Sequence, residues 1–244
     1  MNFDFWQWVL AAVGALAIGV AKTGIGGLGM LAVVIFANLL PAREASGVVL
    51  PMLVFADVFA VLAYRRHAQW NFLWKLFPWT ALGVVLGYFA MGRINDAQAK
   101  LLIGVIVIAL LAVHLWRRRK GGEIAEHGWW FAPTIGVLAG FTTLVANAAG
   151  PLMVIYLLAM RLPKMEYMGT GAVYFMLMNL FKVPFMMSLG LVNPSSLTLN
   201  IWLAPAVLIG ALVGKKLLAH IDQRLFENIA LILAGAAGLK LLFP

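Results

Sequence analysis

The chain has 244 residues, of which 64% are hydrophobic and 11% are charged, a composition outside the range of soluble globular proteins. A net charge of +9 would suggest nucleic acid as a partner of a soluble protein, but here the basic residues gather between apolar runs and indicate membrane topology. The lack of cysteine excludes thiolate metal sites, iron–sulfur clusters and disulfides. We expect an integral membrane protein embedded in lipid, with no cofactor and no nucleic acid.

Ten apolar segments follow one another, several of them near the roughly 20 residues that a helix needs to cross a bilayer. They span residues 5–21, 26–40, 45–64, 72–91, 99–116, 130–146, 149–162, 166–190, 199–218 and 225–243. The second and seventh are short and each follows a polar or glycine-rich break, so each either crosses the membrane or turns back as a re-entrant hairpin. The N-terminal run lacks a basic region and a cleavage site, which indicates a retained helix.

The two halves of the chain resemble each other. An offset of 122 residues aligns Glu44 with Glu166, Gly47 with Gly169 and Asp57 with Asn179, and an offset of 127 aligns Pro78 with Pro205 and Gly83 with Gly210. Chance agreement among abundant Gly and Pro is the alternative, but the preserved order argues against it. We expect a first repeat over residues 1–116, a cytoplasmic linker over 117–128 and a second repeat over 129–244.

The distribution of basic residues predicts the orientation of the spans. Placing the cluster Arg117–Lys120 in the cytoplasm also places Arg65, Arg66 and Lys164 there, whereas the uncharged loop at 192–196 falls outside. Both termini then lie on the extracytoplasmic side, and the second repeat is inverted relative to the first. The expected fold is an all-α polytopic membrane protein of two inverted repeats. Each repeat has a broken or re-entrant short-helix pair plus about three transmembrane helices, a plan that secondary transporters use.

The stretch from Gly19 to Gly29 places a lysine and a cluster of glycines between two apolar segments. It is not a P-loop, because Ala21 precedes the lysine and the flanks are membrane helices. Glycines allow close approach of the backbone, and a helix N-terminus attracts anions, so the pattern favours anion binding. A lysine reaching the interface, with glycines serving helix packing, is the alternative. The candidate binding residues are Lys22, Thr23, Gly24, Gly26, Gly27 and Gly29.

The counterpart in the second half is small, polar and uncharged. Thr143, Asn147 and Gly150 are its candidate binding residues, and Pro151 suits the first turn of a following helix. Hydroxyl and amide groups there can donate hydrogen bonds to the oxygens of a ligand. Helix–helix contact through small and hydroxylated residues is the alternative.

Two further ionisable residues, Asp57 and Lys182, fall inside apolar segments, where an unpaired charge costs about 3 kcal/mol on insertion scales. We expect Asp57 to pair with Lys182 or with Lys22, and the three residues together leave one net positive charge that favours an anion. The same residues also suit a structural ion pair without a ligand, or a proton-coupling role for Asp57. Asn179, the repeat mate of Asp57, is a further candidate for balancing charge, although burial in helix packing is its commoner role.

The length, the two-repeat layout, the glycine-rich break at Gly19–Gly29 and its counterpart at Asn147–Pro151 together resemble the sulfite exporter TauE/SafE family. The resemblance covers essentially the whole chain. It implies a bacterial inner-membrane permease that exports sulfite, sulfoacetate or related organosulfonates, driven by the proton gradient. The first family motif maps to Gly24, Gly26, Gly27 and Gly29. In the second, Ala148 and Ala149 stand where glycines are usual, which puts the symmetry of the pocket in doubt.

We therefore predict a transporter, and not an enzyme, that moves a small sulfur-containing anion by alternating access. An anion channel built from the same residues is an alternative, and proton flux measured with and without substrate separates the two. A metal or cation permease with Asp57 as ligand is disfavoured by the scarcity of intramembrane carboxylates. A membrane scaffold without transport would have tightly packed breaks. A homodimer is compatible with the sequence.

Overall fold

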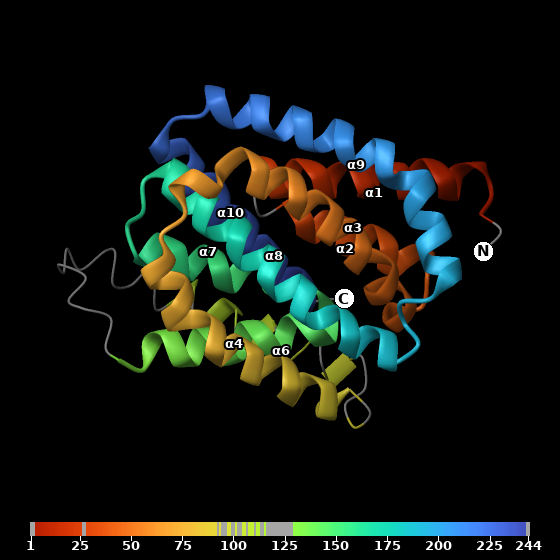
Figure 1. Cartoon of the computed structure of the whole chain (residues 1–244), viewed down its shortest axis with the longest axis horizontal. Helices are drawn as coiled ribbons and strands as arrows, with labels where there is room; N and C mark the ends of the chain where they lie inside the picture. The colour runs from red at the N-terminus through yellow and green to blue at the C-terminus, as the bar shows by residue number, and fades with distance from the viewer. Residues whose placement is uncertain are drawn as a thin grey trace.

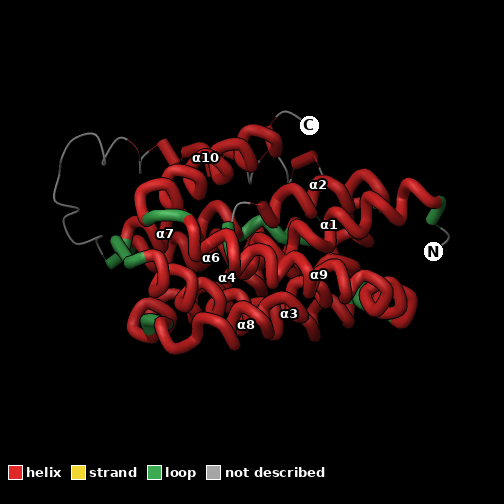
Figure 2. The backbone as a smooth tube through the Cα atoms, turned by 90° about the horizontal axis from the view of Figure 1, so that it is seen from above, coloured by secondary structure: helices red, strands yellow, loops and turns green. Residues whose placement is uncertain are grey.

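The computed structural model describes residues 3–25, 28–91 and 129–242, together with scattered positions from 93 to 115. Every regular element in this part of the chain is a helix (Figures 1 and 2). The elements are α1 (Phe5–Thr23), α2 (Gly29–Leu39), α3 (Ala42–Tyr64), η2 (Arg65–His67), α4 (Trp70–Ala90), α6 (Phe131–Ala146), α7 (Gly150–Ala159), α8 (Lys164–Ser188), α9 (Pro194–His220) and α10 (Gln223–Leu242).

Five helices within the described residues, namely α1, α3, α4, α8 and α9, are long and apolar enough to cross a membrane. The prediction of an all-α polytopic membrane protein is therefore confirmed. Large apolar side chains such as Ile201, Trp202 and Ile232 are exposed, as a surface in contact with lipid requires. The predicted segment 99–116 is described only at scattered positions, and the linker 117–128 lies outside the described residues.

Two short helices follow the two predicted breaks. α2 has 11 residues and α7 has 10, so at roughly 1.5 Å per residue each is about 15 Å long, half the thickness of the hydrocarbon core. α7 begins at Gly150 with Pro151 in its first turn, where proline is tolerated because those N–H groups have no partner within the helix. Both short segments thus form half-length helices.

Pairs of helices from opposite halves of the chain pack together. α1 lies against α9, α4 against α6, and α3 against α8. Figure 1 shows the α1–α9 pair at one edge and the α4–α6 pair at the other, with α3 and α8 between them. Glycine permits the closest contacts, since a Cβ at Gly19 would lie 2.1 Å from the Val207 carbonyl oxygen and one at Gly140 would lie 2.0 Å from that of Thr80.

Candidate functional site

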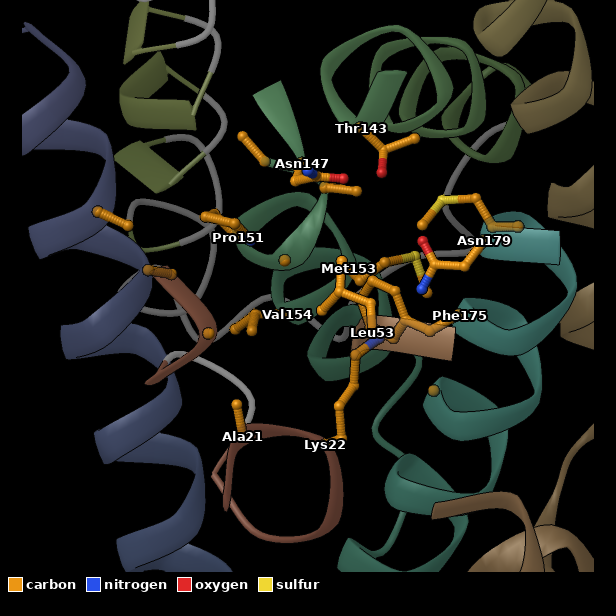
Figure 3. Close-up of a pocket in the computed structure, with 18 of the residues that line it drawn as sticks. Ala21, Lys22, Leu53, Thr143, Asn147, Pro151, Met153, Val154, Phe175 and Asn179 are labelled. Atoms are coloured by element: carbon orange, nitrogen blue, oxygen red, sulfur yellow. The ribbon is translucent and has the colours of Figure 1, made fainter. Parts of the chain in front are cut away.

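A cavity of about 100 Å³ lies where the two helix breaks meet (Figure 3). Lys22 and Gly29 reach it from the first break, and Asn147 and Gly150 from the second. The N-terminal ends of the half-length helices α2 and α7 therefore both line it. The remaining wall is mostly apolar and includes Leu53, Met153, Leu157, Met168, Phe175 and Leu233.

The end of α1 is held in place by two neighbouring helices. The Thr23 hydroxyl donates to the carbonyl oxygens of Gly19, at 3.1 Å, and Ala211, at 2.6 Å, and the Tyr64 hydroxyl donates to the Thr23 carbonyl oxygen at 2.6 Å. Gly24 packs directly against Gly214 of α9. Of the residues expected to bind ligand, Thr23 and Gly24 thus lie in the contact with α9 and do not line the cavity. Gly26 and Gly27 lie outside the described residues.

Lys22 projects from the end of α1 toward α3 and α8. Its Nζ lies 2.7 Å from Oδ1 of Asp57, which is completely buried, and 4.1 Å from the centre of the Phe175 ring. The amide of Asn179 donates to Oδ2 of the same carboxylate at 2.7 Å. Of the two expected partners of Asp57, the structure thus selects Lys22, and the ring face adds a further attraction for its ammonium group.

Lys182 has a separate set of partners at the second break. Its Nζ donates to the Thr143 carbonyl oxygen at 3.1 Å, to the Thr143 hydroxyl at 3.0 Å and to Oδ1 of Asn147 at 2.6 Å. Asn147 ends α6 in a left-handed conformation with φ of 52°, and its amide nitrogen donates to Oγ of Ser46 at 3.0 Å. Lys182 thus ties α8 to the C-terminal end of α6.

The two lysines differ in what they can offer a ligand. An ammonium group has three N–H donors, and Lys182, which is fully buried, has three acceptors around it. Lys22 has one carboxylate oxygen and a ring face, and it lines the cavity, as does Asn179. Of these two lysines, Lys22 is therefore the one with N–H groups available to a molecule in the cavity.

Sequence reasoning missed two members of this arrangement, Phe175 and Ser46. Phe175 lies four residues before Asn179 and therefore on the same face of α8. Its position relative to Asn179 could have identified it as a neighbour of the site from the sequence. Ser46 contacts Asn147 across 101 positions of the chain, and no local pattern marks such a contact. The hydroxyl of Tyr174, also on α8, lies 2.9 Å from Oγ1 of Thr80.

An apolar helical bundle in which two interrupted helices bring a lysine and amide groups to one internal cavity has the architecture of a membrane transporter. The chain belongs to the sulfite exporter TauE/SafE family, whose profile matches residues 10–241. It is 26% identical over 182 residues to the probable inner membrane transporter protein TsaS of Comamonas testosteroni, a match that covers 72% of this chain and 73% of that protein. No solved structure matches the chain.

Proposed function

We propose that this transporter exports small sulfur-containing anions, namely sulfite, sulfoacetate or related organosulfonates, across the inner membrane as a secondary-active permease. The observation that carries the proposal is the placement of Lys22. Lys22 lines the cavity at which both helix breaks meet, and its ammonium group, which has three N–H donors, is paired with a single carboxylate oxygen, Oδ1 of Asp57.

The balance of buried charge favours an anion. The two cations Lys22 and Lys182 accompany Asp57, the only buried carboxylate among the described residues, so this group carries one net positive charge when all three are ionised. The N-terminal ends of α2 and α7, at Gly29 and Gly150, add partial positive charge at the cavity wall. An anion entering the cavity would offset this charge, whereas a metal cation would add to it.

The wall of the cavity favours an organic anion over an inorganic one. Apart from the polar group around Lys22, the lining is built from side chains such as Met153, Leu157 and Phe175. Apolar pockets with a few placed polar groups are typical of sites for organic ligands. An organosulfonate would set its sulfonate group on Lys22 and its carbon chain against this wall.

We also propose that two inverted repeats move the site by alternating access. α1 packs on α9 as α6 packs on α4, a matching set of contacts expected of two related halves. Asp57 and its repeat mate Asn179 are hydrogen-bonded to each other, and equivalent residues that touch must lie near the axis that relates them. The site would then lie at the interface between the repeats, which is where transporters of this plan bind substrate.

Protons are the coupling ions we propose, with Asp57 as the carrier. Asp57 is completely buried and contacts both Lys22 and Asn179. A carboxylate in contact with the residue that binds the anion can link its own protonation to the arrival of substrate, because a proton on Asp57 releases Lys22 from its ion pair.

Replacing Lys22 by methionine tests the proposal. Lys22→Met should abolish uptake of radiolabelled sulfite and hydroxyethanesulfonate into sealed proteoliposomes, because the cation that receives the anion is gone. Lys240→Met, at an exposed position on α10, is the matched control and should transport as the wild type does. Undiminished uptake by Lys22→Met, in a protein that inserts normally, would refute the proposed role.

A further inference from the structure

Asn179 presents one satisfied and one unsatisfied polar atom. Its amide nitrogen donates to Oδ2 of Asp57 at 2.7 Å. Because a carboxylate accepts hydrogen bonds, this contact fixes which end of the amide faces Asp57. The other end, Oδ1, is buried and has no hydrogen-bond partner among the described residues. A buried acceptor without a donor is unfavourable, so one that is retained calls for an explanation.

The residue that carries the unsatisfied acceptor lines the cavity. Asn179 lines it together with Lys22, and Figure 3 shows the Asn179 side chain directed into the space between Thr143 and Phe175. Lys22 and Asn179 contact the two oxygens of the same carboxylate. The two side chains are therefore close enough for a single small ligand to contact both of them. The cavity thus offers a cationic donor and a neutral acceptor next to each other.

We propose that the substrate carries a hydrogen-bond donor, a hydroxyl or amino group, close to its anionic group, and that Oδ1 of Asn179 accepts from this donor while Lys22 binds the anion. The substrate class is then a hydroxyalkyl or aminoalkyl sulfonate. Sulfite and sulfoacetate, which in their fully ionised forms carry only acceptors, would leave Oδ1 of Asn179 unpaired. A site built to bond a substrate hydroxyl discriminates strongly against an analogue that lacks it. This inference rests on the proposed function.

A pair of ligands matched in size tests the inference on the wild-type protein. Hydroxyethanesulfonate and propanesulfonate differ in a hydroxyl group in place of a methyl group. Titration calorimetry on the full chain in lipid nanodiscs should give a dissociation constant at least about tenfold lower for hydroxyethanesulfonate, since burial of an unpaired acceptor weakens the other complex. Equal affinities would overturn the inference.

A variant then assigns the preference to Asn179. Asn179→Leu removes the acceptor, so the ratio of the two dissociation constants should fall close to one. The substitution also removes a hydrogen-bond donor from Asp57. Because both ligands bind Lys22 through the same sulfonate group, this loss should change both dissociation constants by the same factor and leave their ratio unchanged. Asn200→Leu is the control, because Oδ1 of Asn200 is also buried without a hydrogen-bond partner in the described part of the chain, but Asn200 does not line the cavity. It should retain the wild-type ratio.

The outcomes separate the inference from the proposed function. A wild-type protein that binds neither sulfonate contradicts both. Equal binding of the two sulfonates, abolished by Lys22→Met, supports anion transport and refutes the role of Asn179. A wild-type preference for the hydroxyl that persists unchanged in Asn179→Leu also refutes that role. If Asn179→Leu does not fold, the comparison of the two ligands on the wild type still decides the matter.

Discussion

Lys22 places a full positive charge inside the membrane domain, and its neighbours make this tolerable. Asp57 lies 2.7 Å away and the ring of Phe175 lies under the ammonium group. Removing one member of such a pair leaves the other as an uncompensated buried charge, whereas removing both leaves no unpaired charge in the interior. The pair is therefore expected to matter more for binding than for stability.

A double-mutant cycle tests this distinction. Asp57→Leu alone should destabilise the protein by about 3–5 kcal/mol, because Lys22 is left unpaired. The double variant Lys22→Met/Asp57→Leu should recover most of that loss while remaining inactive in transport. Thermal unfolding followed by tryptophan fluorescence measures the stabilities. Additive losses in the double variant would show that the two residues stabilise the fold independently.

The residues at the centre of the site were predictable, but their pairing was not. A lysine or aspartate within an apolar run is visible in the sequence, and Lys22, Asp57, Asn179 and Lys182 are all in the interior. Two lysines were available to one carboxylate, and the choice depends on how α1, α3 and α8 pack. Thr23 shows the same limit, because its hydroxyl bonds to Ala211, 188 positions away.

At the level of helices, apolar runs and glycine-rich breaks predicted most boundaries within two or three residues, as for α1 and α8. The predicted start of α9 was wrong. Residues 192–196 were expected to form a loop, but α9 begins at Pro194. The Asn193 side chain caps the helix by accepting from the Ser196 N–H, and the Asn193 N–H in turn donates to Oγ of Ser196. A proline at the first helical position with a capping residue before it is typical of a helix start. The prediction missed it because residues 193–196 have low hydropathy and the helices were predicted from apolar segments.

The close contacts at glycines between paired helices predict that a larger side chain at such a position lowers the stability of the protein. Gly140→Val should destabilise the protein by at least about 1–3 kcal/mol, because the new side chain meets the backbone of Thr80, which cannot move without separating α4 from α6. Thr134→Val, at an exposed position of the same helix, is the control for introducing valine into α6. An unfolding midpoint for Gly140→Val equal to that of the control would contradict the packing argument.

On the scale of the whole molecule, apolar side chains form both the core and much of the exposed surface of the described residues, and a few polar side chains are buried among them. Polar groups from the two halves meet in the interior, where Asp57 contacts Asn179 and Ser46 contacts Asn147. The halves are therefore joined through the polar groups around the cavity. The predicted orientation, with both termini extracytoplasmic, depends on the distribution of basic residues and stays a prediction.

The most direct test of the central claim is an experimental structure with a sulfonate that carries a heavy atom, such as bromohydroxypropanesulfonate. The sulfonate should lie on the Lys22 ammonium group between the ends of α2 and α7, with its hydroxyl at Oδ1 of Asn179 and an anomalous bromine peak inside the cavity. A bromine peak elsewhere in the protein, with Lys22 making no contact to the sulfonate, would contradict the account.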